Sequence, residues 1–240
     1  MLGRVVGLRA KQVLAALVFG MVGIEAHAAE YDPWESLNLK VHRFNDKLDV
    51  VILRPTANFY VRVLPPVARR GVSNFFSNIN DVTVLLNNVL QLKLVDAASD
   101  SGRIVLNTTL GLGGLVDVAT PAGLMKNNED FGQTLGKWGV GPGPYMVLPL
   151  FGPSNLRDTF GLAADTFTNP LTHQDDATVR NWAFIVQQLD RRVAALAVDS
   201  MMMGDPYIFT REAYLQQRQY LVTDGEIQDQ WDDDDWGAWD

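Results

Sequence analysis

The chain has 240 residues, the length of one large domain or two small ones, and 47% of them are hydrophobic, so it can form a packed core. Its net charge of −8 and isoelectric point of about 4.8 argue against a nucleic-acid-binding protein, which normally carries a concentrated basic face. The absence of cysteine excludes disulfides, thiolate metal sites, a cysteine nucleophile and a lipid attached through cysteine.

A secretory signal peptide is predicted over residues 1–28. Arg4, Arg9 and Lys11 form a positive first part, and the uncharged stretch 13–24 is too short to span a bilayer comfortably. The small residues of Ala26-His27-Ala28 then predict cleavage before Ala29. An exported chain without cysteine fits a bacterial periplasm or outer membrane, and an uncleaved amphipathic helix is the alternative.

A long amphipathic helix is expected from Asp32-Pro33 to residue 53. Asp32 can cap it, proline suits the first turn, and Glu35 follows at the spacing of a capping box. Arg54-Pro55 is expected to end or kink this helix. Its apolar residues recur every three or four positions and form one stripe: Trp34, Leu37, Val41, Phe44, Leu48 and Val51.

Three further helices follow from the same periodicity. One covers 81–94, with Asp81 as a plausible cap, and another covers 178–203 and is closed by Gly204. A third starts at Asp205-Pro206. Sustained alternation of apolar and polar residues is absent, so few strands are expected and the fold class is mainly α.

Two stretches in the middle of the chain combine apolar residues with frequent glycine and proline. Residues 104–125 contain a single charge, Asp117, and residues 140–155 contain none. Such irregular apolar backbone suits a position against protein at membrane depth or along a cavity. A buried loop region in an ordinary soluble domain explains it equally well.

Residues 223–240 form an acidic tail with three tryptophans, which is typical of a solvated, disordered segment. The motif search gives no enzyme signature. The glycines near position 111 lack the third glycine of a dinucleotide loop, and His173 beside Asp175 and Asp176 is better explained as a polar loop than as a metal site. We therefore expect no catalysis, no cofactor and no metal.

Several motifs occur in the order typical of one protein family, and the chain resembles the MlaA family, also called VacJ. They include Asn107-Thr108-Thr109-Leu110-Gly111, Val116-Asp117-Val118-Ala119, Phe131-Gly132-Gln133-Thr134-Leu135-Gly136, Leu156-Arg157-Asp158 and Asp205-Pro206-Tyr207-Ile208. The resemblance covers residues 31–220. It implies a ring-like arrangement of amphipathic helices with Gly/Pro-rich apolar loops, lying on the periplasmic side of the outer membrane.

The resemblance also implies a function. It implies a passive phospholipid channel that removes mislocalised lipid from the outer leaflet and so maintains lipid asymmetry. Its implied partners are phospholipids, an outer-membrane porin trimer and a periplasmic lipid carrier, without nucleic acid. Most family members carry a lipobox cysteine, which this sequence lacks, so a soluble periplasmic lipid-binding or porin-associated scaffold protein is the alternative.

Two groups of residues are candidates for the lipid path. The first lies on the helix after Asp32, whose polar face would line the channel wall, and consists of Lys40, Arg43, Phe44, Asn45 and Lys47. The second is a candidate gate in the glycine-rich stretch, where altered backbone angles cost little, and consists of Gly111, Gly113, Gly114 and Asp117.

Overall fold

The structure is a computed structural model that describes residues 32–197, 199, 202 and 204–226. The predicted signal peptide and most of the acidic tail lie outside these residues. Helices predominate, which confirms the mainly α class. In chain order the elements are α2 (Glu35–Leu48), the π-helical turn η1 (Asp49–Leu53), α3 (Arg54–Val63), α4 (Pro66–Leu90), α5 (Leu94–Thr109), α6 (Phe131–Lys137), β1 (Tyr145–Leu148), β2 (Gly152–Asn155), α7 (Leu156–Thr168), the 3₁₀ turn η2 (Pro170–His173), α8 (Ala177–Ala195) and α9 (Pro206–Val222).

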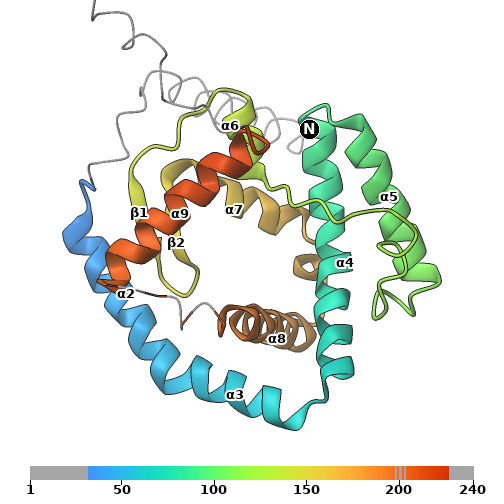
Figure 1. The fold of residues 1–240 in the computed structure, drawn as a ribbon, viewed down its shortest axis with the longest axis horizontal. Coiled ribbons are helices and arrows are strands. Elements are labelled where there is room, and N and C mark those ends of the chain that lie inside the picture. The colour runs from blue at the N-terminus through green and yellow to red at the C-terminus, as the bar shows by residue number, and fades with distance from the viewer. Residues whose placement is uncertain (1–31, 198, 200–201, 203, 227–240) are drawn as a thin grey trace, which may run out of the picture.

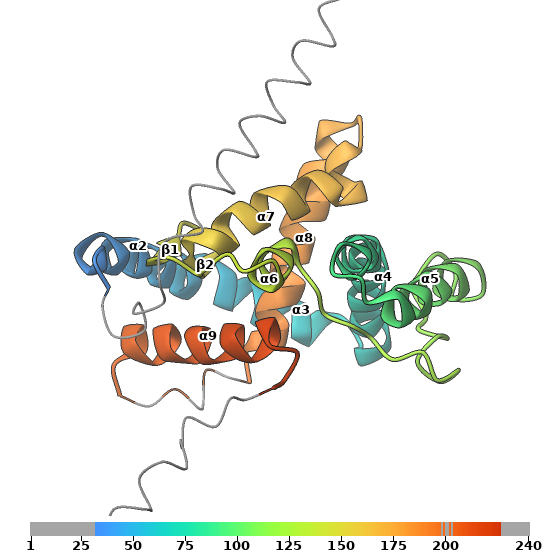
Figure 2. The ribbon, with the colours of Figure 1, turned by 90° about the horizontal axis from the view of Figure 1, so that it is seen from above.

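The helices form a ring rather than layers around a central core (Figure 1). α2 and α3 follow one arc, α4 continues it, and α6, α7, α9 and the β1–β2 hairpin complete the circle. α8 lies inside the arc of α3, and α5 packs on the outer side of α4. Seen from above, α9 lies on one face of the ring and α7 on the other (Figure 2). Among the described helices, none is both long and apolar enough to cross a bilayer.

The first helix does not end at Arg54-Pro55, where an end or a kink was expected. α2 passes through η1 directly into α3, and the Arg54 N–H bonds to the Asp49 carbonyl five residues back. Pro55 has no N–H to donate and stands at the start of α3, where none is required. The wider π turn thus lets the chain continue along the arc of the ring.

The predicted start of this helix is also wrong by a few residues. α2 begins at Glu35, and Trp34 provides no side-chain cap. The Asp32 carboxylate instead accepts hydrogen bonds from the Trp34 N–H (3.1 Å) and from Asn38 Nδ2 (2.9 Å), and it also contacts the Tyr207 hydroxyl. Asp32 therefore joins the first helix to α9 instead of forming a capping box.

Of the other predicted helix boundaries, one is confirmed and two are wrong. Asp205 caps α9 by accepting from the N–H groups of Tyr207 (2.8 Å) and Ile208 (3.1 Å), as expected. Asp81 is not a cap, because it lies inside the 25-residue helix α4. α8 ends at Ala195, earlier than predicted. The described residues contain only one short antiparallel pair of strands, which agrees with the expectation of few strands.

Polar side chains occupy much of the interior. Of the largest fully buried side chains only Val84 is apolar, and the others are Asn38, Asn87, Asn88, Asn155, Thr134, Asp81 and Asp100. Most of them have polar partners: Asp81, for example, forms ion pairs with Arg103 and Lys126. A soluble domain normally buries its large aliphatic side chains instead.

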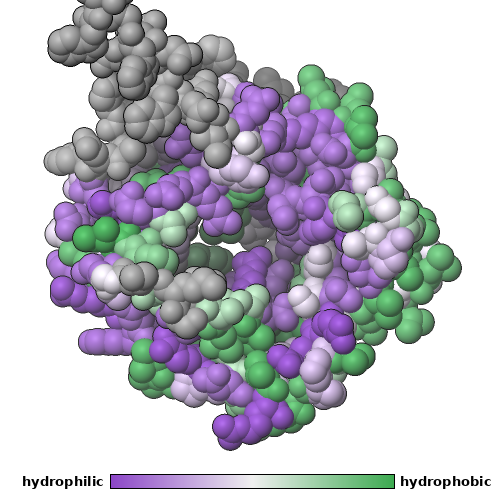
Figure 3. Space-filling model, in the orientation of Figure 1, coloured by the Kyte–Doolittle hydropathy of each residue, from purple (hydrophilic) through white to green (hydrophobic). Residues whose placement is uncertain are grey.

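Large apolar side chains lie on the outside of the ring. In the stretch 104–125, which includes the loop after α5, Leu110 and Leu112 are 68% and 72% exposed, so the interpretation of this stretch as a buried core loop is wrong. In the stretch 140–155, by contrast, Tyr145 and Val147 are buried against Tyr207, as that interpretation predicts. Figure 3 shows hydrophobic residues along the margin formed by α5 and its loop and in patches among hydrophilic residues near α3, and hydrophilic residues over much of the rim of a central hollow. An exposed apolar surface of this kind marks an interface with membrane or protein.

Candidate functional site

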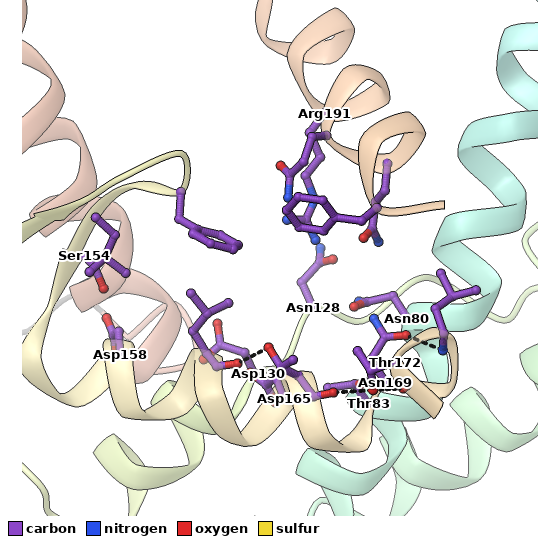
Figure 4. A pocket seen from close by; sticks show the side chains of 18 of the residues that line it. Asn80, Thr83, Asn128, Asp130, Ser154, Asp158, Asp165, Asn169, Thr172 and Arg191 are labelled. Atoms are coloured by element: carbon purple, nitrogen blue, oxygen red, sulfur yellow. Dashed lines mark hydrogen bonds between the residues drawn. The ribbon is translucent and has the colours of Figure 1, made fainter. Parts of the chain in front are cut away.

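A cavity of about 890 Å³ lies inside the ring. Every part of the ring except α2, α3 and α5 contributes to its lining: α4, the segment leading into α6, the β1–β2 hairpin, α7, α8 and α9. The lining is rich in charged, amide and hydroxyl groups, among them Asn80, Asp130, Asp158, Asp165, Gln188 and Arg191. Apolar side chains such as Phe151, Phe184 and Ile185 also line it, so the cavity is amphipathic, and Figure 4 labels its main polar residues.

A buried ion-pair network supports one wall. Arg218 of α9 donates two hydrogen bonds to Asp130 (2.6 and 2.9 Å) and one to Asp158 (2.8 Å). Asp158 also accepts from Arg157 Nε (2.9 Å) and the Tyr214 hydroxyl (2.6 Å). Burial alone would raise the pKa of Asp130 and Asp158, but the hydrogen bonds and charge of Arg218 outweigh it and hold both pKa values below the usual range. Both carboxylates are thus ionised and neutralised by arginine.

Asp165 lies two helical turns after Asp158 on α7, so both carboxylates share one face of the helix. It accepts from the Phe131 backbone N–H (3.0 Å) and from Asn87 Nδ2 (3.1 Å), and no ion pair with a cation is formed among the described residues. Burial is the largest influence and, together with the nearby charge of Asp130, it raises the pKa of Asp165 to about 6. Among the described residues, Asp165 is thus the only carboxylate of the cavity lining that forms no ion pair.

α8 provides the opposite wall, and the charged side chains that it contributes to the lining, Arg180 and Arg191, are basic. Figure 4 shows Arg191 on this helix across the open space from Asp130 and Asp165. Within the described residues Arg191 makes no hydrogen bond or ion pair, and burial lowers its pKa, with the charge of the adjacent Asp190 opposing that effect. Nearer one end of the helix, Arg180 donates to the Gln174 carbonyl (3.0 Å).

An aromatic contact narrows the cavity between the hairpin and α8. The Phe151 ring, at the turn of the hairpin, lies with its centroid 6.1 Å from that of Phe184 on α8. Leu150 in the same turn has a φ of 69°, an unfavourable value for a residue with a Cβ, and Gly152 has a φ of 83°. The turn is thus held in a tight conformation that directs Phe151 toward α8.

The candidate channel residues on α2 do not line the cavity. Lys40, Arg43, Phe44 and Lys47 are exposed to solvent. Asn45 is the exception in role: its Nδ2 donates to the Leu148 carbonyl (3.0 Å), and its Oδ1 accepts from the Leu150 N–H (2.9 Å). Asn45 therefore positions the hairpin turn that reaches the cavity.

The candidate gate lies on the side of α4 away from the cavity (Figure 1). Gly113 and Gly114 have φ values of 71° and 91°, so the chain uses glycine there for its backbone conformation. Asp117 accepts from the Thr120 N–H (3.1 Å) and from Asn107 Nδ2 (3.2 Å). The glycine segment is thus folded onto the end of α5, and its gating role stays a prediction.

Sequence reasoning missed the residues that matter most in the cavity, which are Asp165, Arg191 and Arg218. The pair of acids seven positions apart, Asp158 and Asp165, was a usable signal once a helix over 156–168 is recognised. The described part of the chain has no cluster of histidine and carboxylate side chains able to hold a metal ion. His173 Nε2 is instead 2.6 Å from the Phe167 carbonyl.

Comparison with known proteins agrees with this architecture. The family model described as MlaA lipoprotein matches residues 30–221. The chain belongs to the MlaA family. It is 35% identical over 231 residues to the Escherichia coli K12 protein named intermembrane phospholipid transport system lipoprotein MlaA, covering 90% of this chain and 91% of that one.

Other relatives of this MlaA-family chain include an uncharacterised protein of Rickettsia prowazekii, 36% identical over 196 residues, which are 80% of this chain and 78% of that protein. A solved structure from work on the "structural basis for maintenance of bacterial outer membrane lipid asymmetry" superimposes with a TM-score of 0.72 at 36% identity. It covers 80% of this chain and all of the solved chain. The fold is therefore that of MlaA, as the sequence resemblance implied.

Proposed function

We propose that this protein is a passive phospholipid channel of the outer membrane, through which mislocalised outer-leaflet lipid passes toward the periplasm. The observation that carries the proposal is an amphipathic cavity, rich in charged and amide groups, inside a ring that exposes large apolar side chains on α3, α5 and the loop after α5. The relatives support it, because the Escherichia coli, Shigella flexneri and Haemophilus influenzae proteins are named intermembrane phospholipid transport lipoproteins.

Physical chemistry explains why such a ring can move a lipid without an energy source. A charged head group is costly to bring into hydrocarbon unless it meets water or polar partners. The cavity offers those partners through its carboxylate, amide and guanidinium groups. The exposed apolar side chains around the margin, such as Val95 and Leu112, match acyl chains outside. When the head group lies in the cavity and the tails lie toward the margin, the head group contacts polar groups and the tails contact apolar ones.

We place the ring in the inner leaflet of the outer membrane and propose two protein partners. A passive channel needs an acceptor that carries lipid away, so a soluble periplasmic lipid carrier must receive the lipid on the periplasmic side. The apolar margin is also suited to packing against an integral protein, and a porin trimer fits that role. The protein acts in this proposal without covalent chemistry.

Membrane association and lipid transfer test the proposal together. The mature chain should float with outer-membrane vesicles and stay bound after a high-salt wash, because salt removes proteins held by charge but leaves apolar insertion intact. Envelopes lacking the protein should accumulate phospholipid in the outer leaflet. A protein released by the wash that still binds lipid would support the soluble periplasmic scaffold instead.

A further inference from the structure

The charges that line the cavity are not all neutralised by one another. Asp130 and Asp158 are paired with Arg218 and Arg157, and Glu129 is paired with Lys93 (2.8 Å). When these pairs are set aside, the lining retains a negative charge on α7, Asp165, and positive charges on α8, Arg191 and Arg180.

Asp165 and Arg191 face one another across open space and form no ion pair. Both are fixed to rigid helices, and Asp165 is held further by the Phe131 N–H and Asn87. The walls therefore keep the two charges apart, with room between them.

Gln133, which also lines the cavity, has an acceptor atom without a hydrogen-bond partner among the described residues. Gln133 is only 3% exposed, and its Nε2 donates to the Asn128 carbonyl (3.1 Å) and Asp130 (3.2 Å). Its Oε1 is buried and accepts no hydrogen bond from any residue that the structure describes. A buried acceptor without a donor costs free energy.

From this arrangement we infer that the cavity contains a head-group site selective for zwitterionic phospholipids with a primary ammonium, the phosphate binding at Arg191 and the ammonium at Asp165. This inference rests on the proposed phospholipid-channel function and specifies its substrate. A head group of this kind neutralises both walls at once. An anionic glycerol head group satisfies Arg191 but leaves the carboxylate without a cation, and a trimethylated head group offers it no N–H donor.

The test measures which lipids the purified full chain retains. Protein in detergent is exchanged into mixed micelles that contain equal amounts of phosphatidylethanolamine, phosphatidylcholine and phosphatidylglycerol, and bound lipid is quantified by native mass spectrometry. We expect phosphatidylethanolamine to exceed phosphatidylglycerol about tenfold, the scale of one charge-assisted hydrogen bond, with phosphatidylcholine in between. Equal retention of the three lipids by the wild-type protein would overturn the inference while leaving the channel proposal intact.

Two variants assign the selectivity to the two walls. Asp165→Asn should bring the ratio of phosphatidylethanolamine to phosphatidylglycerol close to one, whereas the exposed Asp175→Asn should leave it unchanged. Arg191→Gln should lower retention of all three lipids, and the exposed Arg70→Gln should not. Unchanged selectivity in a folded Asp165→Asn protein would overturn the inference. Retention of no phospholipid at all by the wild-type protein would refute the channel proposal itself.

Discussion

Asp165 makes the stability of the protein depend on pH in a direction opposite to that of its neighbours. Because its pKa is raised from 3.8 to about 6, the folded state binds more protons than the unfolded chain between these values. The ionised carboxylate therefore destabilises the fold above pH 6, and this cost disappears as the pH falls toward 4. Asp130 and Arg218, the charged groups that influence it, stay ionised throughout this range.

Replacing Asp165 by asparagine should thus stabilise the protein near neutral pH. Asn can still accept hydrogen bonds from the Phe131 N–H and Asn87, so we expect a gain of about 1–3 kcal/mol at pH 7, since each pKa unit corresponds to about 1.4 kcal/mol. Thermal unfolding at pH 7 and pH 4 measures it. A gain of equal size at both pH values would contradict the assignment.

Arg218 is expected to be among the most sensitive single residues for stability. Arg218→Met removes three hydrogen bonds and leaves Asp130 and Asp158 without their common partner, which should cost about 3–5 kcal/mol. Arg211→Met on the same helix is a matched control, since its partner Glu212 is partly exposed and such pairs contribute under about 1 kcal/mol. Urea unfolding compares the two, and equal losses would contradict the role assigned to Arg218.

At the scale of elements, the sequence predicted those helix boundaries that depend only on residues close together in the chain. The cap of α9 at Asp205 is an example, because an aspartate before proline satisfies the first N–H groups of a helix by itself. Asp81 carries a similar signal but is buried in α4 between Arg103 and Lys126, partners that are distant in sequence. No local pattern could reveal them.

The cavity could not be predicted from the sequence for the same reason. Asp165 and Arg191 belong to different helices, and only the closure of the ring brings them to facing walls. The apolar stripe of α2 was recognised, but periodicity does not tell whether a stripe faces lipid, a neighbouring helix or a core. The family resemblance predicted the ring-like arrangement of helices, but the residues that line its cavity could be identified only from the structure.

The hairpin turn should depend on Asn45. Asn45→Ala removes both hydrogen bonds to the turn, which should cost about 1–3 kcal/mol and raise amide exchange over residues 148–152. Lys47→Ala, on the exposed side of the same helix, should change neither. Hydrogen–deuterium exchange detects the difference, and an unchanged turn in the Asn45 variant would show that the Phe151–Phe184 contact holds it instead.

The glycine-rich segment can be tested as a gate because the chain has no cysteine of its own. A Cβ placed on Gly71 of α4 would lie 3.6 Å from the Leu115 carbonyl, so Gly71→Cys with Leu115→Cys provides a pair that can lock the segment to α4. If the segment is a gate, oxidation should change lipid transfer and reduction should restore it. Equal transfer in both states would exclude a gate at this position.

At the scale of the whole molecule, polar groups lie inside and large apolar side chains lie outside, which is the reverse of the usual distribution in a soluble protein. Charged and amide groups line the cavity, while large aliphatic and aromatic side chains, such as Phe59 and Val95, face outward. Water around the entire ring would leave this apolar margin at a high free-energy cost, so the fold is suited to a boundary between lipid and water. The central claim is that a lipid head group enters the cavity while its tails stay at the margin.

Photolabelling with two phospholipid probes tests this claim most directly. One probe carries a diazirine on the head group and the other carries it at the end of an acyl chain, and both are incorporated into membranes that contain the full chain. The account predicts that the head-group probe labels the cavity faces of α7 and α8, at positions such as Thr166 and Gln187, and that the acyl probe labels Val95 and Leu112. Head-group labelling confined to the outer margin, with none in the cavity, would contradict it.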